Sequence, residues 1–220
     1  MMVSDAKWLG KVLPQFSDEE LSPVLNIGSS TKKFREQDQP HIHKYVFAPL
    51  DERGIKVVHC DLKQAEGVDV SADIFDDEAL KQLASYNAKA IICTHMFEHV
   101  VDKEDLAKRL LSLIPQNGLF FITVPSSYHQ HDDPIDTMYR PTPEELAQLF
   151  EGQDIIRKDI LVDGNYWDKI KQRPLTLFFR HFTRFFIPFI SISKWKRSMR
   201  KLYWLFNNYK VSAIVGRKVV

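Results

Sequence analysis

The chain has 220 residues, of which 44% are hydrophobic and 27% are charged, and its formal net charge is +1. This length suits one sizeable domain, and the composition is that of a soluble globular protein. No run of residues approaches the ~20 apolar residues of a transmembrane helix, and the first ten residues lack the apolar core of a signal peptide. Both cysteines, Cys60 and Cys93, sit inside apolar runs, so we expect buried, reduced thiols in a cytoplasmic protein rather than a disulfide framework.

Charge is distributed unevenly along the chain. The residues after Asp168 contain 13 of the 30 basic residues and none of the 29 acidic ones. The first 168 residues therefore carry a net charge of −12, and the remainder carries +13. Such a split indicates either an anionic partner for the C-terminal part or a tail that folds onto an acidic body.

Short apolar runs alternate with amphipathic segments. The runs that predict buried strands are 23–28, 55–61, 67–75, 88–94, 119–125, 154–162 and 211–219. The segments that predict helices are 44–54, 76–86, 102–114 and 142–150. Strands separated by helices imply an α/β fold, namely a doubly wound, mostly parallel seven-stranded sheet with right-handed crossovers.

Small or acidic residues follow the first three strands of this predicted sheet. Gly28 and Ser30 follow the first strand, Asp61 closes the second, and Asp73 follows the third. In an open α/β sheet, ligands bind beyond the carboxyl ends of the strands. Gly28 permits close approach of the backbone to a ligand, and a carboxylate at the tip of the next strand can accept both hydroxyls of a ribose. The pattern therefore predicts a nucleoside-binding site at this edge.

The ordered series of motifs resembles the class I S-adenosylmethionine-dependent methyltransferases, in particular bacterial members associated with sugar or surface-glycan metabolism. The resemblance extends from about Pro23 to Phe150, and the segment VSAIVGRKV fits the family's closing antiparallel strand. It implies a Rossmann-like methyltransferase fold and S-adenosylmethionine as the cofactor. The motifs that carry it are VLNIGSST at 24–31, HMFEHV at 95–100, LIPQNGLFFITVP at 113–125 and HDDPIDTMYRPTPEEL at 131–146.

The same resemblance assigns cofactor contacts to individual residues. It places the methionine part at the loop after the first strand, the ribose at the tip of the second strand, and the adenine after the third. The implied contacts are Asn26, Gly28 and Ser30 for the methionine part, Asp61 with its neighbour Leu62, Asp73 with its neighbour Ile74, and Thr94 and His95 at the cofactor edge.

Two positions depart from the family pattern: Asn26 replaces the usual acid, and Ser30 replaces the second loop glycine. Asparagine can accept a hydrogen bond but has no charge to pair with the cofactor's ammonium group, a difference of about 1–1.5 kcal/mol. The departures leave open an alternative function, that of a catalytically inactive methyltransferase-like binding or scaffold protein. A nicotinamide-dependent oxidoreductase would need three spaced glycines, which GSSTKKF at 28–34 lacks.

The stretch THMFEHV at 94–100 contains His-x-x-Glu-His, a spacing that some zinc peptidases use. In those enzymes the motif lies within a helix, which brings both histidines onto one face. Here His95 follows directly on a buried strand, and helix signals begin only near Asp102. We therefore expect Glu98 and His99 to anchor the following loop by hydrogen bonds, with His95 at the cofactor edge.

The segment 128–140 is the best source of groups for chemistry. Methyl transfer requires a positioned nucleophile and, for a hydroxyl acceptor, removal of its proton. We expect His131 to be the general base, with Asp133 or Asp136 orienting its ring. Tyr139 and Arg140 would contact an anionic or sugar-like substrate. The alternative is that Asp136 and Arg140 form a salt bridge that shapes the loop.

Two histidine-containing groups also have the composition of a metal site. The first is HQHDD at 129–133, and the second is the pair His41 and His43. Nothing in their spacing joins the two groups, so no metal site is predicted.

The segment 169–209 reads as two helices, rich in aromatic and basic residues, inserted before the last strand. Its aromatic spacing and positive charge predict an interfacial anchor, through residues 175–206, on an anionic membrane at the inner face. A lid over the substrate cleft or a homodimer face is an equal alternative, and nucleic acid is a weaker one. The residues at helical spacing are Leu175, Phe178, Phe179, Phe182, Phe186, Phe189, Trp195, Met199, Leu202, Tyr203 and Phe206.

The sequence thus predicts one methyltransferase-like domain over 1–220 with an inserted helical segment. The predicted reaction is transfer of a methyl group from S-adenosylmethionine to a small or membrane-linked metabolite, such as a glycan or lipid precursor.

Overall fold

The computed structural model describes residues 1–130, 135–172, 179, 182 and 192–219. The strands are β1 (Val24–Ile27), β2 (Val57–Asp61), β3 (Val70–Ser71), β4 (Ala90–Thr94), β5 (Leu119–Ser127), β6 (Asp154–Val162) and β7 (Lys210–Arg217). The α-helices are α1 (Val3–Val12), α2 (Asp18–Leu21), α3 (Ala48–Glu52), α4 (Asp77–Ala84), α5 (Lys103–Ser112), α6 (Pro143–Gln148), α7 (Tyr166–Gln172) and α9 (Ile192–Tyr203). Shorter turns are η1 (Leu13–Gln15) and η4 (Phe97–His99), both 3-10, and η2 (Phe34–Asp38) and η3 (His43–Phe47), both π-helical.

The seven strands form one sheet in the order β3-β2-β1-β4-β5-β7-β6. Neighbouring strands from β3 to β5 are parallel, whereas β7 is antiparallel to both β5 and β6. The predicted mostly parallel sheet with an antiparallel closing strand is confirmed. The weakest predicted strand, 67–75, is reduced to the two residues of β3 because only Cys60 and Asp61 of β2 pair with it.

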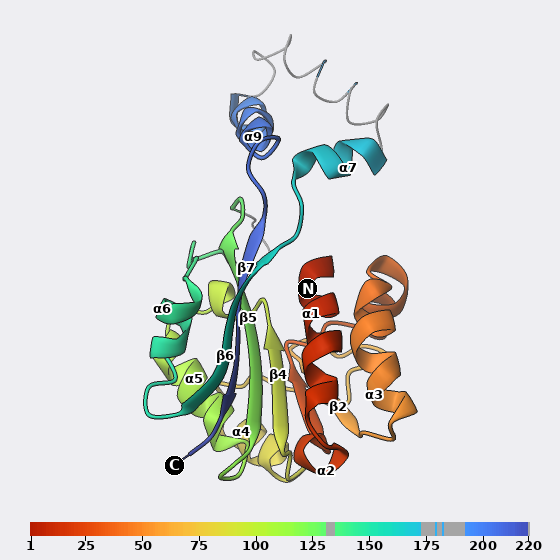
Figure 1. Cartoon of the computed structure of the whole chain (residues 1–220), viewed down its shortest axis with the longest axis vertical. Helices are drawn as coiled ribbons and strands as arrows, with labels where there is room; N and C mark the ends of the chain where they lie inside the picture. The colour runs from red at the N-terminus through yellow and green to blue at the C-terminus, as the bar shows by residue number, and fades with distance from the viewer. Residues whose placement is uncertain (131–134, 173–178, 180–181, 183–191, 220) are drawn as a thin grey trace.

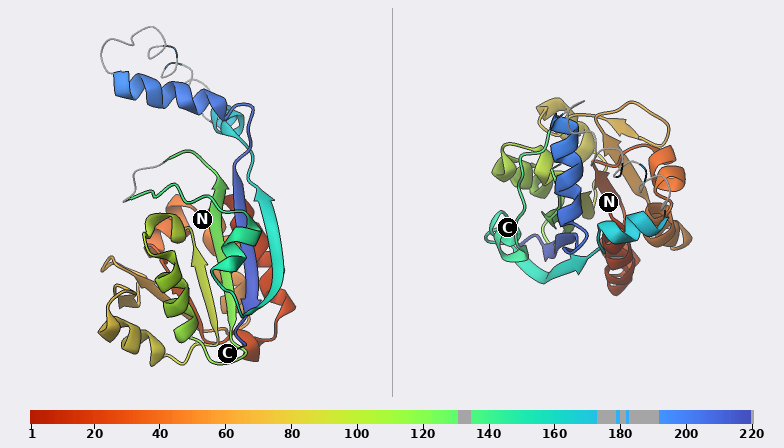
Figure 2. Two further views of the ribbon diagram at one scale, coloured as in Figure 1. Left: turned by 90° about the vertical axis from the view of Figure 1, so that its left-hand side faces the viewer. Right: turned by 90° about the horizontal axis from the view of Figure 1, so that it is seen from above.

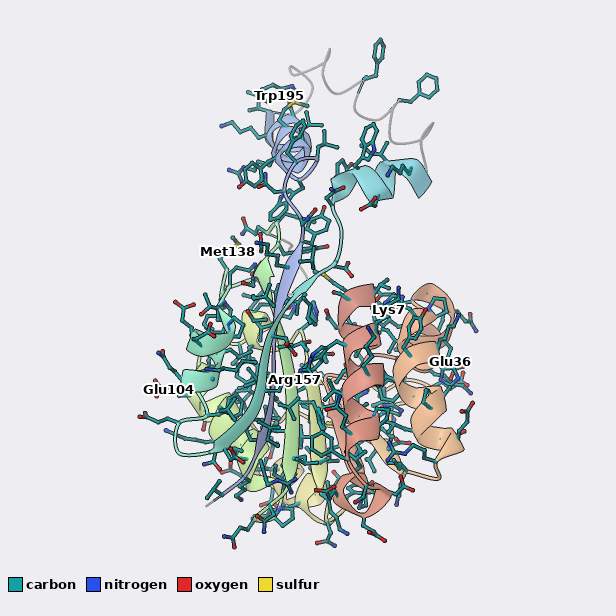
Figure 3. All side chains as sticks on the ribbon, in the orientation of Figure 1. Lys7, Glu36, Glu104, Met138, Arg157 and Trp195 are labelled. Carbon is teal, nitrogen blue, oxygen red and sulfur yellow. The ribbon has the colours of Figure 1, made fainter. Side chains whose placement is uncertain are left out.

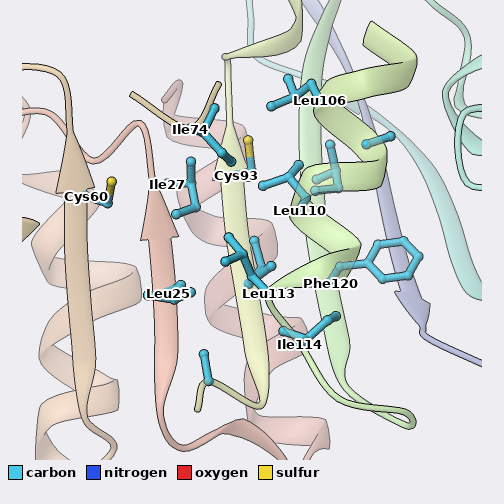
Figure 4. Close-up of a cluster of buried hydrophobic side chains, with 14 of the residues drawn as sticks. Leu25, Ile27, Cys60, Ile74, Cys93, Leu106, Leu110, Leu113, Ile114 and Phe120 are labelled. Atoms are coloured by element: carbon cyan, nitrogen blue, oxygen red, sulfur yellow. The ribbon is translucent and has the colours of Figure 1, made fainter. Parts of the chain in front are cut away.

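Helices cover both faces of the sheet (Figure 1). On one face α4, α5 and α6 pack over alternate strand residues, with Leu106 and Leu110 of α5 against Ile91 and Cys93 of β4 (Figure 4). On the other face α1, η3 and α3 cover the intervening residues, such as Ile92. Strands buried on both faces explain the continuous apolar runs in the sequence. Cys60 and Cys93 are free and buried, as predicted.

Helix starts follow the predicted capping signals. Asp76 caps α4 and Asp102 caps α5, each accepting backbone N–H groups of the first turn. Thr142 caps α6 in a capping box with Glu145, with Pro143 at the first helical position. The helix predicted at 44–54 is realised as the π-helical turn η3 leading into α3.

Helix α1 was not predicted. Ala6, Leu9 and Val12 recur at helical spacing on its buried side, and they pack against the sheet in the same core as η3. The start of α1, where the N-terminus lies, faces the carboxyl ends of the parallel strands (Figure 1). The helix therefore contributes to any site at that edge.

The predicted insertion lies between β6 and β7, as α7 and α9 with residues 173–191 largely outside the described ranges. Both helices stand beyond the carboxyl ends of the parallel strands (Figures 1 and 2). At its base, Tyr166, Trp204 and Tyr209 pack together with Tyr128 and Met2 of the body. The Tyr166 N–H donates to the Trp204 carbonyl oxygen at 2.8 Å, which joins the two helices where they leave the sheet.

Candidate active site

A cavity of about 480 Å³ lies at the carboxyl ends of β1, β4 and β5. This volume falls within the ~300–1,000 Å³ range of small-molecule sites. The cavity is at the edge where the sequence predicted the cofactor. Five of the predicted contacts line it together: Asn26, Gly28, Ser30, Thr94 and His95.

The loop after β1 forms one wall of this cavity and turns through left-handed backbone conformations. Gly28 has a φ of 72° and Ser30 a φ of 54°. Glycine adopts such angles without steric penalty, whereas serine does not. A Cβ at Gly28 would meet the Met96 sulfur at an ordinary 3.6 Å, so the conformation of the loop, rather than lack of space, requires glycine here.

Asp61 lies at the tip of β2, as predicted, but its carboxylate already contacts the backbone of the protein. Its Oδ2 accepts the Ser30 N–H at 2.7 Å, and its Oδ1 accepts the Lys63 N–H at 3.1 Å. A carboxylate has about four acceptor positions, so Asp61 can fix the loop and still accept hydroxyl groups. Its role as a ribose ligand stays a prediction.

Like Asp61, the other three predicted contacts on this side are not among the residues that line the cavity. Leu62 is 69% exposed, and Ile74 is buried in the core. Asp73 is exposed, and its Oδ1 accepts the Phe75 N–H at 3.0 Å in a local turn. The structure therefore does not bring Leu62, Asp73 and Ile74 to the cavity that Gly28 lines, and their roles stay predictions.

Arg35 was not predicted, yet it clamps the loop after β1. Its side chain is buried, and its Nη1 donates to the carbonyl oxygens of Ser29 and Ser30 at 3.1 and 2.6 Å. Its Nη2 donates to the Gly67 carbonyl oxygen at 2.7 Å, on the segment between β2 and β3. Burial lowers the pKa of Arg35, while nearby carboxylates, Asp69 first, act in the opposite direction. One guanidinium thus joins two loops beside the cavity.

Asn26 pairs with a histidine on the neighbouring strand. Its Nδ2 donates to Nδ1 of His59 at 2.9 Å, and the two residues face each other in the β1–β2 register. Burial, followed by the charge of Arg35, lowers the pKa of His59 to about 4. The ring is therefore neutral near pH 7 and accepts the Asn26 N–H through Nδ1. This fixes the amide so that its oxygen is free to accept a hydrogen bond from a ligand.

His95 is held between two buried carboxylates. Its Nε2 contacts Oδ2 of Asp5 at the start of α1, and its Nδ1 lies 3.4 Å from Oε1 of Glu98. The side chains of Asp5 and Glu98 are both 0% exposed. His95 also has a left-handed φ of 53°, and its N–H donates to the Thr123 carbonyl oxygen at 2.9 Å. His95 lines the cavity, and its place at the edge of the cofactor stays a prediction.

The pKa values of the three groups are shifted together. Burial disfavours the charged form of each, but the attraction between them prevails. The pKa of His95 is raised because Asp5 lies beside it, and the pKa values of Asp5 and Glu98 are lowered because of His95. We therefore assign an imidazolium between two carboxylates, a cluster with one net negative charge.

Glu98 and His99 were expected to anchor the following loop by hydrogen bonds, and this expectation is met in part. Nδ1 of His99 donates to the Ile135 carbonyl oxygen at 2.5 Å. The backbone oxygen of Glu98, rather than its carboxylate, accepts the N–H and the hydroxyl of Thr137 at 2.8 and 3.0 Å. The anchored segment is thus residues 135–137, which follow β5, and not the loop directly after Glu98.

Asp136 and Arg140 form a salt bridge, which was the predicted alternative to roles in catalysis and substrate binding. Nη2 of Arg140 donates to Oδ2 of Asp136 at 2.6 Å, and the Asp136 side chain is 0% exposed. Met138, labelled in Figure 3, lies between them, and its N–H donates to Oδ1 of Asp136 at 2.8 Å. The pair shapes the turn, and an additional catalytic role for Asp136 stays a prediction.

Tyr139 and Arg140 line a second cavity, of about 860 Å³, beside α5 and α6. The residues that line it do not include Gly28 or His95. Nζ of Lys103 lies over the Tyr139 ring at 4.9 Å, and burial raises the pKa of Tyr139 to about 12. The structure does not bring the two predicted substrate contacts to the cofactor cavity, and their role stays a prediction.

The predicted base His131 and its partner Asp133 lie outside the described residues. Within the described ranges, no three His, Cys, Asp or Glu side chains are arranged to hold a metal ion.

Sequence reasoning missed three polar residues of the site, namely Asp5, Arg35 and His59. The helical spacing of Ala6, Leu9 and Val12 was the available signal for the element that carries Asp5. No local motif marks Arg35 or His59, because their partners lie on other strands and loops.

The chain is an α/β protein whose cavity lies at the carboxyl ends of β1 and β4, between which the order of the strands reverses. In open α/β sheets, ligands bind at such a topological switch point. The family model described as "Methyltransferase domain" matches residues 7–157, more than half of the chain. The chain belongs to this family. The resemblance to class I methyltransferases, whose methyl donor is S-adenosylmethionine, is thereby confirmed.

Solved structures share the fold at low sequence identity. Coclaurine N-methyltransferase bound to N-methylheliamine and SAH has a TM-score of 0.56 at 14% identity, covering 97% of this chain and 69% of that chain. The mycolic acid cyclopropane synthase CmaA1, complexed with SAH and CTAB, has a TM-score of 0.52 at 12% identity, with coverage of 96% and 83%. The [4+2]-cyclase SpnF has a TM-score of 0.52 at 12% identity, with coverage of 97% and 81%. A search of curated proteins found no match.

Proposed function

We propose that the chain transfers a methyl group from S-adenosylmethionine to a small or membrane-linked metabolite, such as a glycan or lipid precursor. The observation that carries the proposal is the cavity that brings Asn26, Gly28, Ser30, Thr94 and His95 together at the carboxyl edge of the sheet. Methyl transfer is an in-line displacement, so the protein mainly has to position donor and acceptor. The solved relatives named above that contain SAH support the same choice of cofactor.

Two glycines with nearly equal backbone angles provide a matched test of the cofactor site. Gly28 has a φ of 72° and lines the cavity, whereas Gly54 has a φ of 70° and lies at the turn after α3. Alanine at either position is strained by about 1–2 kcal/mol. We expect Gly28→Ala to weaken S-adenosylhomocysteine binding in isothermal titration, and Gly54→Ala to leave it unchanged. Absence of binding of both S-adenosylmethionine and S-adenosylhomocysteine to the unmodified chain would favour the alternative of an inactive module.

The helical insertion supports a membrane-linked acceptor. Trp167, Tyr203 and Phe206 are exposed, Phe206 to 89%, and Lys196 and Arg200 on α9 are exposed with them. Aromatic residues beside cations on an amphipathic helix favour an anionic bilayer surface. No helix among the described residues is long and apolar enough to cross a bilayer. The insertion stands beyond the carboxyl ends of the parallel strands (Figure 2), the end at which the cavity lies, and this would place a lipid headgroup near the donor.

Liposome flotation tests this part of the proposal. We expect the chain to float with vesicles that contain anionic lipid and to remain at the bottom with neutral vesicles. Phe206→Ser should reduce flotation, whereas Ile156→Ser, at an exposed position of β6 outside the insertion, should not affect it. Absence of flotation with either kind of vesicle would leave the lid or homodimer as the interpretation of the insertion, and equal flotation with both would refute the role of anionic lipid.

A further inference from the structure

Glu98 is a buried carboxylate without a hydrogen-bond donor among the described residues. Its side chain is 0% exposed, and neither Oε1 nor Oε2 has a hydrogen-bond partner. Oε1 of Glu98 lies 3.4 Å from Nδ1 of His95 and 3.9 Å from Nε2 of His99. Glu98 lines the cofactor cavity together with both histidines. A buried carboxylate that lacks donors is costly unless another group supplies them.

The neighbours of Glu98 do not fully neutralise it. The imidazolium of His95 is shared with Asp5, which contacts the other ring nitrogen. The wall at Glu98 therefore keeps unsatisfied acceptor positions.

We propose that Glu98 receives the acceptor of the reaction and that this acceptor is an amine, which enters as an ammonium ion. This inference rests on the proposed methyltransferase function and names its substrate class. An ammonium group supplies three N–H donors and a positive charge, which is what both oxygens of Glu98 lack. The same cavity wall carries Thr94 of β4 and His95 directly after it, at the predicted edge of the cofactor, so donor and acceptor meet there.

The methyl transfer to an amine balances in protons, bonds and charge. The ammonium ion first loses one proton to water, which leaves a neutral amine while Glu98 stays anionic. The nitrogen lone pair then forms a bond to the methyl carbon while the bond between that carbon and sulfur breaks, with its electron pair remaining on sulfur. The products are S-adenosylhomocysteine and a methylated ammonium ion. Positive charge moves from sulfur to nitrogen without being lost, so an anionic side chain beside the path stabilises the whole displacement.

The test uses ligands of the unmodified protein that need no knowledge of the acceptor. Sinefungin carries an amine at the position of the transferred methyl group, whereas S-adenosylhomocysteine has neither the amine nor the sulfonium charge. We expect sinefungin to bind about tenfold more tightly than S-adenosylhomocysteine, the effect of one charge-assisted contact. Glu98→Gln should abolish this preference and leave the affinity for S-adenosylhomocysteine unchanged. Isothermal titration measures all the affinities.

Glu144→Gln is the matched control, because Glu144 is exposed on α6 and does not line the cavity. Retained S-adenosylhomocysteine binding by Glu98→Gln shows that the variant is folded. Equal affinities of the unmodified protein for sinefungin and S-adenosylhomocysteine would overturn the inference, as would a preference that survives in Glu98→Gln. A loss in Glu98→Gln that is equally large for S-adenosylmethionine would assign Glu98 to the sulfonium and refute the amine. Failure of S-adenosylhomocysteine to bind the unmodified protein would instead refute the proposed function itself.

Discussion

The two walls of the cofactor cavity differ in how their polar groups are satisfied. On the β1–β2 wall, the side chains of Asn26 and Arg35 each make at least one hydrogen bond to another part of the chain, and Asp61 at the tip of β2 accepts the backbone N–H of Ser30. On the β4 wall, defined by Thr94, His95, Glu98 and His99, the Glu98 carboxylate has an ionic neighbour but no hydrogen bond among the described residues. The first wall is preorganised to hold a ligand, and the second keeps a charge available for one.

The largest expected effect comes from removing the cation of the β4 wall. His95→Asn keeps a residue that tolerates the left-handed φ but leaves Asp5 and Glu98 without the imidazolium between them. Breaking a buried ion pair in this way costs about 3–5 kcal/mol. We expect a loss of that size in the free energy of unfolding, measured by urea denaturation. His43→Asn, at an exposed histidine, should change it by less than about 0.5 kcal/mol.

The same cluster predicts a pH dependence of stability. The pKa of His95 is raised above its ordinary 6.5, so its contribution is fully present below pH 6.5 and is lost as pH rises through the folded-state pKa. The pKa values of Asp5 and Glu98 are lowered from 3.8 and 4.5, so their contribution is present above those values and is lost in acid. We expect the stability difference between the unmodified chain and His95→Asn to be largest between about pH 4.5 and 6.5. A difference that does not vary from pH 4 to pH 9 would exclude a charged cluster.

On the opposite wall, Arg35→Lys should weaken both the fold and the cofactor site. A lysine cannot reproduce the planar fork that contacts three carbonyl oxygens of two loops. We expect a loss of about 2 kcal/mol in stability and about tenfold weaker binding of S-adenosylhomocysteine. Arg53→Lys is the control, because Arg53 also donates to two carbonyl oxygens and an aspartate but lies away from the cavity. Its stability should fall comparably while its affinity stays the same.

The contrast between the walls also shows what the sequence could predict. The apolar runs and capping residues define the order of strands and helices, and the strand-end rule locates Gly28, Thr94 and His95 at one edge. These inferences need only local patterns. The contacts that set protonation and loop geometry join residues far apart in the chain: Asp5 is 90 residues from His95, and Asn26 is 33 residues from His59. Such pairings depend on strand register and on how α1 packs, which no single segment encodes.

Asp61 and Arg140 show that a residue identified from the sequence can already have partners within the chain. Both residues were identified from the sequence, Asp61 at the end of the second predicted strand and Arg140 in the loop segment that follows the fifth. Both side chains nevertheless bind other parts of the chain. Asp61 holds the loop after β1, and Arg140 pairs with the Asp136 carboxylate and donates to the Tyr139 carbonyl oxygen at 2.9 Å. A sequence motif specifies which chemical groups are near a site, while the hydrogen-bond partners decide how many of their positions remain for a ligand.

The smallest expected effect sharpens the comparison at Asn26. Asn26→Asp restores a negative charge where the cofactor's ammonium group is expected, and His59 can accommodate it by carrying its proton on Nδ1, which then donates to the new carboxylate. Exchange of a neutral for a charge-assisted contact is worth about 1–1.5 kcal/mol. We expect about tenfold tighter binding of S-adenosylhomocysteine at pH 8. Asn87→Asp, at an exposed turn after α4, adds the same charge away from the cavity and should leave the affinity unchanged. An unchanged affinity in Asn26→Asp would mean that the methionine part of the ligand does not lie against β1, and that the preorganised wall holds a different part of it.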